Sequence, residues 1–209
     1  MPVRFVINSL KKLTKKSQTI FDTLALDLLS NPDMKSVAVT SNFQKEGKSY
    51  VALQLASSMS KLGMKVVYLD MNLCTASLKK QYGIRFDGAY SGIDDLLSGK
   101  VSLGSIICST NLPNVSMILT SQRAETRSAV IDRSKVRSTI DALATVFDYI
   151  IIDTASISDG ADALRVASAC DGTILVVQEG QTSTDELDVA VRRIKKSGGS
   201  IVASVLNQH

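Results

Sequence analysis

The sequence predicts a doubly wound α/β domain, in which a mainly parallel sheet carries helices on both faces. Two observations lead to this fold class. Short runs of apolar, mostly β-branched residues alternate with stretches whose apolar residues recur at helical spacing. The runs are also apolar from end to end, which is typical of parallel strands that are covered on both faces.

The elements follow in order along the chain. The apolar runs predict strands at residues 36–40, 65–70, 115–119, 149–153, 172–177 and 201–206. The amphipathic stretches predict helices at residues 18–29, 48–62, 132–146, 162–169 and 184–197. The last helix has a clear end, because Lys195 and Lys196 place cations in its final turn and glycines follow. We expect residues 82–114 to be largely irregular, apart from a short helix in "GIDDLLSG".

Length and composition limit the possible functions. A chain of 209 residues has room for one well-packed domain rather than two. The net charge of +4 is too small to indicate a nucleic-acid partner, and we expect none. The three cysteines form no CxxC pair and the single histidine ends the chain, which argues against a structural zinc or iron–sulfur site and favours the reducing cytoplasm. No apolar run approaches the roughly 18 residues of a membrane span.

Residues 1–16 are expected to form a basic leader before a single domain at residues 17–209. Apolar residues recur there at helical spacing, with four lysines clustered behind them: Val3, Val6, Leu10 and Leu13, then Lys11, Lys12, Lys15 and Lys16. Such a segment could lie on an acidic membrane surface, or it could be a solvated leader. The residues alone leave both interpretations open.

The stretch "NFQKEGKS" follows the first predicted strand and matches the phosphate-binding pattern GxxxxGK[ST], with Asn42 in place of its first glycine. An apolar strand before it and an amphipathic helix after it would point the helix N-terminus at a bound anion. Lys48 would then bring positive charge to the outer phosphates, and the Ser49 hydroxyl would ligate Mg²⁺. The alternative is an ordinary strand–turn–helix with a surface lysine.

Two aspartates are expected at the same edge of the sheet. Asp70 and Asp153 each follow at least four apolar residues, which places them at the carboxyl ends of strands. Ligands of doubly wound sheets bind at that edge, where the loop also lies. Either aspartate alone could be a helix cap or a turn former. Together with Lys48 they predict a nucleotide–magnesium site whose metal ligands are Ser49, Asp70 and Asp153.

These motifs, in this order, resemble the bacterial tyrosine kinase family of capsular and exopolysaccharide biosynthesis, a P-loop branch related to the MinD and ParA ATPases. The first motif of the family has the form "TSxxPGEGKST", against "TSNFQKEGKSY" here. The next motif has the form "LLIDADLRKPSL", against "VYLDMNLCTASL", and the last has the form "FDYIIIDTPP", against "FDYIIIDTAS". The similarity extends from about residue 17 to residue 207 and includes weaker agreements between the motifs.

The resemblance implies a P-loop NTPase fold and a cytoplasmic kinase that uses ATP and Mg²⁺ to phosphorylate protein tyrosines. It assigns catalysis to Lys48, Asp70 and Asp153, and it puts Asn207 near the adenine. The nucleotide would be held by Gln44, Lys45, Glu46, Gly47, Lys48, Ser49 and Tyr50. The implied partners are a membrane-embedded polysaccharide chain-length regulator with an activating cytoplasmic tail, further copies of the kinase, and tyrosine-containing substrates. Such a protein would lie peripherally at the inner face of the plasma membrane.

The chain departs from the family pattern at chemically important positions. Lys45 replaces a glycine beside the phosphates, where it could add a cation or block the site. Asn72 replaces an aspartate, and Ala155 and Ser156 replace paired prolines, which predicts a looser turn. These departures leave a second hypothesis open: a degenerate, catalytically weak or inactive nucleotide-binding regulator of a membrane polysaccharide-assembly complex. Basic residues in 184–197 leave a partitioning-type ATPase as a third.

Overall fold

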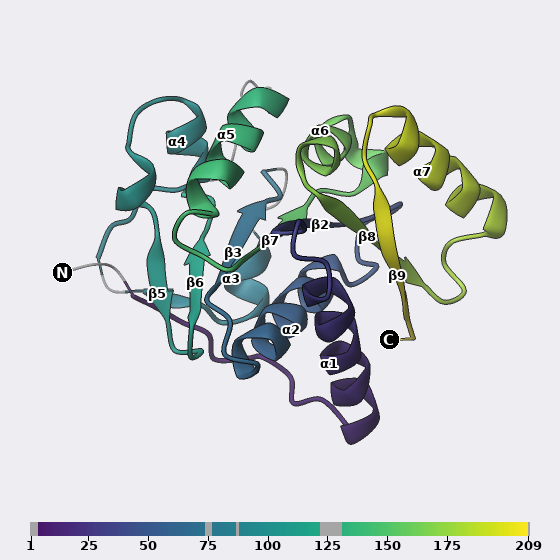
Figure 1. Cartoon of the computed structure of the whole chain (residues 1–209), viewed down its shortest axis with the longest axis horizontal. Helices are drawn as coiled ribbons and strands as arrows, with labels where there is room; N and C mark the ends of the chain where they lie inside the picture. The colour runs from purple at the N-terminus through teal and green to yellow at the C-terminus, as the bar shows by residue number, and fades with distance from the viewer. Residues whose placement is uncertain (1–3, 74–76, 87, 122–130, 209) are drawn as a thin grey trace.

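A computed structural model describes residues 4–73, 77–86, 88–121 and 131–208, and within them nine strands form one sheet (Figure 1). The strand order is β4-β1-β5-β6-β3-β7-β2-β8-β9. The six neighbouring strands from β6 to β9 in this order are all parallel. The antiparallel pairs are β5 with β6 and β1 with β4. The predicted fold class, a mainly parallel doubly wound sheet, is therefore confirmed.

The strands are β1 Arg4–Val6, β2 Ser36–Ser41, β3 Val66–Met71, β4 Arg85–Phe86, β5 Cys108–Thr110, β6 Val115–Ile118, β7 Tyr149–Thr154, β8 Gly172–Gln178 and β9 Ile201–Asn207. The α-helices are α1 Lys15–Leu29, α2 Lys48–Lys61, α3 Ser77–Gln81, α4 Ile93–Leu97, α5 Arg133–Leu143, α6 Asp162–Ala169 and α7 Thr184–Lys196. Two 3₁₀ turns are η1 Leu103–Ser105 and η2 Ile157–Asp159. All six predicted strands and all five long predicted helices are present.

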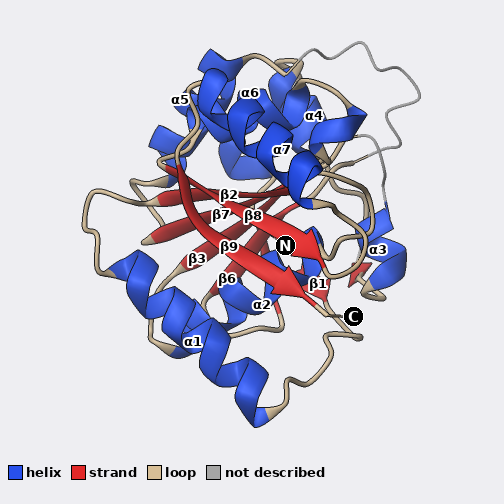
Figure 2. Ribbon diagram, turned by 90° about the vertical axis from the view of Figure 1, so that its right-hand side faces the viewer, coloured by secondary structure: helices blue, strands red, loops and turns tan. Residues whose placement is uncertain are grey.

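Helices cover both faces of the sheet (Figure 2). The helices α1 and α2 lie on one face, and α4, α5, α6 and α7 lie on the other. Strand β7 shows why its sequence is apolar without interruption: Ile151 packs into the core beneath α1 and α2, whereas Ile150 and Ile152 pack into the core beneath α5 and α6. Burial on both faces removes the polar alternation that a half-exposed strand would show.

The N-terminal residues differ from the expected leader. Arg4–Val6 forms β1, which pairs in parallel with β5, and the Phe5 side chain is fully buried. Phe5 packs edge-on against Phe86 and Tyr90, so its burial offsets the cost of ordering the segment. The apolar residues that suggest a helix here therefore include part of a short strand, and helix α1 begins only at Lys15, where Thr14 caps it.

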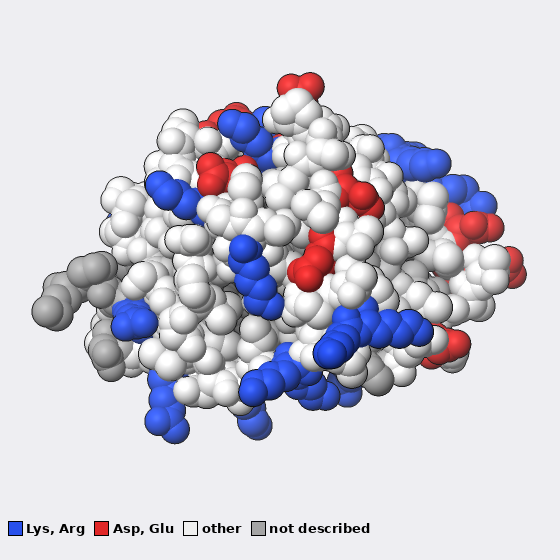
Figure 3. Space-filling view, turned by 60° about the horizontal axis from the view of Figure 1, so that its bottom comes forward, with Lys and Arg blue, Asp and Glu red and all other residues white. Residues whose placement is uncertain are grey.

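The four lysines of this segment, Lys11, Lys12, Lys15 and Lys16, are exposed. Figure 3 shows a face on which Lys and Arg side chains gather along one side, while Asp and Glu side chains lie mostly away from them. Over the described residues, no helix has both the length and the apolar content needed to cross a bilayer.

Residues 82–114 contain more regular structure than the sequence predicts. The predicted short helix is α4, but β4, η1 and β5 are also present. Both of these strands are only two or three residues long and pair with segments far away in the chain, including β1. Local residue patterns carry little information about such short, non-local pairings.

Candidate functional site

A tight loop at residues 42–47 joins β2 to α2 at the carboxyl edge of the sheet. Gly47 immediately precedes α2 with a φ of 98°, which only glycine adopts without strain. A Cβ at this position would also collide with the Asn207 side-chain amide. Lys45 has a φ of 65°, so a residue with a side chain occupies a backbone conformation that glycine would favour. The loop thus has two positions, 45 and 47, at positive φ, and only the second of them is a glycine.

Glu46 and Asn207 hold this loop in place. The fully buried Glu46 carboxylate accepts a hydrogen bond from the Phe43 N–H at 2.7 Å through Oε2. Its Oε1 accepts hydrogen bonds from the Gln178 N–H and the Thr182 hydroxyl, which lie on and just beyond β8. The Asn207 amide donates to the Glu46 carbonyl oxygen at 3.0 Å. Glu46 and Asn207, which both belong to the predicted nucleotide-binding set, therefore connect the loop to β8 and β9.

Lys48 opens α2 and points back into the loop. Its Nζ donates to the Ser41 hydroxyl at 3.0 Å and to the Phe43 carbonyl oxygen at 3.3 Å. Burial lowers the pKa of this lysine, an effect that the nearby negative charge of Asp153 opposes. A positive charge at a helix N-terminus, surrounded by loop carbonyls, is well placed to attract an anion.

Asp153 lies one residue before the end of β7 and contacts Ser49 in the first turn of α2. Its Oδ2 accepts hydrogen bonds from the Ser49 hydroxyl at 2.5 Å and from the Tyr68 hydroxyl at 2.7 Å. Its Oδ1 is buried and has no partner among the described residues. Burial raises the pKa of Asp153, while the bonds from Ser49 and Tyr68 and the charge of Lys48 oppose that rise. A buried carboxylate oxygen without a partner is costly unless a ligand completes it.

Asp70 lies on the neighbouring strand β3, opposite Asp153 in the register. Both of its oxygens have partners: the Thr120 hydroxyl donates to Oδ2 at 2.9 Å, and the Asn72 N–H donates to Oδ1 at 3.1 Å. Burial and the nearby charge of Asp153 raise the pKa of Asp70 to about 7. The carboxyl group of Asp70 therefore keeps its proton to a higher pH than an exposed aspartate does.

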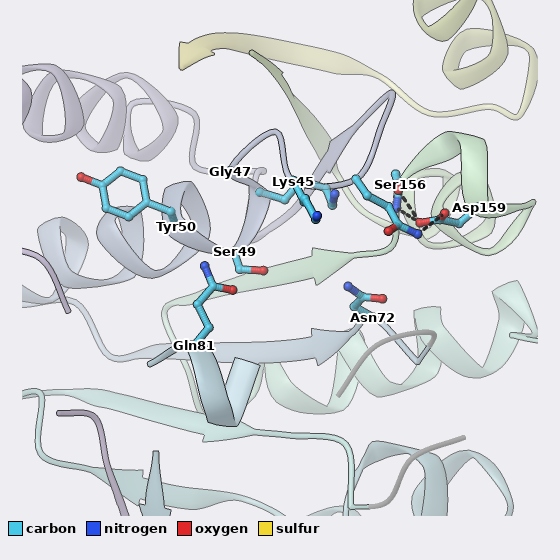
Figure 4. Close-up of a pocket in the computed structure, with 10 residues that line it drawn as sticks. Lys45, Gly47, Ser49, Tyr50, Asn72, Gln81, Ser156 and Asp159 are labelled. Carbon is cyan, nitrogen blue, oxygen red and sulfur yellow. Dashed lines mark hydrogen bonds between the residues drawn. The ribbon is translucent and has the colours of Figure 1, made fainter. Parts of the chain in front are cut away.

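Lys48 and Ser49 border a cavity of about 420 Å³, whereas the buried Asp70 and Asp153 are not among its lining residues (Figure 4). Its lining residues are Gln44, Lys45, Gly47, Lys48, Ser49, Tyr50, Asn72, Gln81, Ser156 and Asp159. In Figure 4 the side chains of Ser49, Asn72 and Gln81 face one another below the loop, whereas the Tyr50 ring points away. The Tyr50 ring instead lies edge-on to Phe21 of α1, with 6.2 Å between ring centroids.

Four lining residues lie outside the predicted set of site residues: Asn72, Gln81, Ser156 and Asp159. Ser156 and Asp159 form a capping box on η2, in which the Asp159 carboxylate accepts bonds from the Ser156 N–H and hydroxyl. Asp159 also accepts a bond from the Gln44 side chain at 2.7 Å. The turn that lacks paired prolines is thus held by side-chain hydrogen bonds, and the S-x-x-D spacing was a visible signal for it.

Ser49 and Asp153 fit a magnesium ion. Ser49 offers a hydroxyl oxygen and Asp153 a carboxylate oxygen without a partner, and both are hard oxygen ligands. Among the described residues, no group of three or more His, Cys, Asp or Glu side chains gathers as a cage for a metal. Magnesium needs no such cage when phosphates and water supply its other ligands.

A strand–loop–helix with a lysine and a serine at the helix start, backed by an aspartate on the adjacent strand, defines the class of P-loop nucleotide-binding proteins. A family model described as "AAA domain" matches residues 34–202, and the chain belongs to this family. It is also 30% identical over 204 residues to tyrosine-protein kinase CpsD of Streptococcus agalactiae, a match that covers 97% of this chain and 88% of that one. The protein is thus a member of the bacterial tyrosine-protein kinase family.

Other relatives agree with this placement. Tyrosine-protein kinase CpsD of Streptococcus pneumoniae serotype 4 is 26% identical over 209 residues, covering 100% of this chain and 91% of that one. The kinase domain of Escherichia coli tyrosine kinase ETK superposes with a TM-score of 0.79 at 20% identity, covering 88% of this chain and 72% of that one. MinD of Pyrococcus horikoshii, complexed with Mg-ADP, gives a TM-score of 0.70 at 24% identity, covering 84% and 71%. These two structures confirm the fold.

Proposed function

We propose that this protein is an ATP-dependent protein tyrosine kinase that acts in capsular or exopolysaccharide biosynthesis. One observation carries the proposal: Lys48, Ser49 and Asp153 converge at the N-terminus of α2, and Asp153 Oδ1 is left without a partner among the described residues. This arrangement suits a triphosphate and a divalent cation. The relatives named as tyrosine-protein kinases support the choice of a tyrosine hydroxyl as the acceptor.

In the proposed reaction, the acceptor tyrosine oxygen bonds to the γ-phosphorus of ATP, and the bond between that phosphorus and the bridging oxygen of ADP breaks. Lys48 neutralises charge on the outer phosphates, and the backbone of the 44–50 loop holds them in line. Ser49 and Asp153 would hold Mg²⁺, which supplies charge neutralisation between the phosphates. Gln44, Lys45 and the backbone of Tyr50 would border the nucleotide, and Asn207 would lie towards the adenine.

Asp70 is the proposed partner of the acceptor hydroxyl, with a secondary role beside the metal. A base works best when its pKa lies near the working pH, and burial raises the pKa of Asp70 to about 7. A carboxylate with this pKa can accept the proton that the tyrosine hydroxyl releases.

The proposed partners are a membrane-embedded polysaccharide chain-length regulator, whose cytoplasmic tail activates the kinase, and further copies of the kinase. The structural relative described as the chimerical protein CapA2B2 supports a two-component arrangement; its TM-score is 0.77 at 19% identity. The exposed lysines at residues 11–16 would favour a place at the cytoplasmic face of an acidic membrane.

Calorimetry with ATP and ADP, each with and without Mg²⁺, tests the nucleotide site. We expect magnesium-dependent binding of both nucleotides, and Lys48→Met should abolish phosphate release. Lys61→Met is the matched control, because Lys61 is the last residue of the same helix and is exposed. A phosphotyrosine blot of the protein mixed with the regulator's cytoplasmic tail then tests the acceptor.

Three results separate the alternatives. Failure of the wild-type protein to bind either nucleotide would overturn the proposal. Binding without phosphate release, unchanged by Lys48→Met, would favour the degenerate regulator. Phosphate release without phosphotyrosine would leave an ATPase and remove the kinase activity.

A further inference from the structure

Tyr68 contacts the site from the core of the protein and does not line the cavity. It lies on β3, two residues before Asp70, and its side chain is fully buried in the core beneath α1 and α2. Its hydroxyl crosses to the neighbouring strand β7 and donates to Asp153 Oδ2 at 2.7 Å. A tyrosine in an apolar strand ordinarily contributes its ring to the core. Here the hydroxyl also donates a hydrogen bond to Asp153 Oδ2, the same oxygen to which the Ser49 hydroxyl donates.

The Tyr68 hydroxyl is the donor in this contact, because a carboxylate oxygen accepts hydrogen bonds. Its bond to Asp153 is also shielded from water, because both side chains are almost fully buried.

The two hydrogen bonds donated to Asp153 Oδ2 determine the orientation of the Asp153 carboxylate. A carboxylate that rotates exchanges its two oxygens, and this rotation would break the bonds from both Ser49 and Tyr68. Ser49 is itself a proposed metal ligand, so its geometry changes with the ligand that is bound. Tyr68 lies outside the cavity lining and can hold the carboxylate in any ligand state.

We propose that Tyr68 is a positioning residue for the metal site: its hydroxyl fixes the Asp153 carboxylate so that Oδ1 stays available for the cation or for the water bound to it. This inference rests on the proposed function, because it requires Asp153 to take part in magnesium binding. Partners that orient metal ligands in this way commonly contribute about ten- to hundredfold to metal affinity.

The test compares Tyr68→Phe with Tyr149→Phe. Tyr149 begins β7, is equally buried, and its hydroxyl has no hydrogen-bond partner among the described residues, so it is a matched control. Calorimetry measures the affinity for ADP with and without Mg²⁺. We expect Tyr68→Phe to reduce the gain in affinity that Mg²⁺ provides by about tenfold, to leave metal-free ADP binding unchanged, and Tyr149→Phe to change neither.

A second measurement does not depend on how the variant folds. Fluorotyrosine placed at position 68 alone should show a ¹⁹F shift change when Mg²⁺ is added to the ADP-bound protein, and none when ADP is added without the metal. An unchanged magnesium gain in a folded Tyr68→Phe protein, or a ¹⁹F signal insensitive to Mg²⁺, would overturn the inference. A wild-type protein that binds ADP equally well with and without Mg²⁺ would instead remove the proposed metal site itself.

Discussion

The two buried aspartates at the carboxyl edge of the sheet, Asp70 and Asp153, each follow an apolar strand in the sequence. In the structure they differ in how hydrogen bonds are distributed over their two oxygens. They face each other across β3 and β7, and both are at most 3% exposed. Asp153 concentrates its donors on Oδ2 and keeps Oδ1 without a partner among the described residues. Asp70 has one donor on each oxygen. The difference separates two roles that the sequence assigns to both residues.

An oxygen without a partner in a buried carboxylate is available to a cation, whereas a carboxylate bonded at both oxygens must give up a bond before it ligates anything. Asp153 is therefore the stronger candidate for the metal, and Asp70 is the stronger candidate for exchanging a proton, since its pKa is about 7. The sequence assigns metal binding to both, and that assignment stays a prediction for Asp70.

The largest difference is expected between Asp153→Asn, which tests metal binding, and Asp70→Asn, which tests proton exchange. We expect Asp153→Asn to remove the magnesium-dependent part of ADP binding and to lower turnover on the order of a thousandfold, because the lost charge stabilises the cation. Asp70→Asn should retain most of the magnesium-dependent binding and lower turnover about a hundredfold, the usual scale for loss of a general base. Calorimetry and phosphate-release rates give the two readings; equal loss of metal-dependent binding in both variants would end the distinction.

The stability of the nucleotide-free protein should depend on pH through Asp70. Its folded pKa of about 7 lies above the unfolded value of 3.8, so the folded state binds the extra proton between these two limits. The contribution to the free energy of unfolding is complete below about pH 4, decreases as pH rises, and is lost above about pH 7. By linkage it amounts to at most about 4 kcal/mol.

Urea denaturation at several pH values checks this dependence. Asp153 also has a raised pKa, so the relevant quantity is the difference between the wild-type protein and Asp70→Asn. The wild-type protein should gain stability relative to the variant as the pH is lowered from 8 to 5. A difference that stays constant over this range would show that Asp70 is ionised throughout.

Much of the site could be predicted from the sequence because its parts lie at the ends of strongly patterned strands. Lys48 and Ser49 follow β2, and Asp153 lies near the end of β7, so a parallel sheet alone brings them together. The partners of the aspartates could not be predicted. Tyr68 and Thr120 belong to or follow apolar strands, and only the strand order decides which carboxylate each hydroxyl reaches.

The backbone conformation of the loop at residues 42–47 and the short strands near one edge of the sheet could not be predicted from the sequence either. Lys45 has a positive φ in a loop that is held by hydrogen bonds of Glu46 and Asn207. Asn207 is far from the loop in sequence, so this contact leaves no local signal. The strands β4, at one edge of the sheet, and β1, beside it, are too short to leave a periodic pattern. Both are consequences of tertiary contacts rather than of local residue preferences.

The smallest effect is expected from removing single hydroxyl donors, Thr120 at Asp70 and Ser49 at Asp153. Thr120→Val removes the donor on Asp70 Oδ2 without changing side-chain shape, which should lower the free energy of unfolding by about 1–2 kcal/mol and leave magnesium-dependent ADP binding unchanged. Ser49→Ala removes a donor of the same kind from Asp153 Oδ2, and it should weaken that binding as well. Denaturation and calorimetry on this pair decide whether hydroxyl bonding at the two aspartates serves different purposes. If Thr120→Val reduces the magnesium gain as much as Ser49→Ala does, Asp70 takes part in metal binding despite its two occupied oxygens.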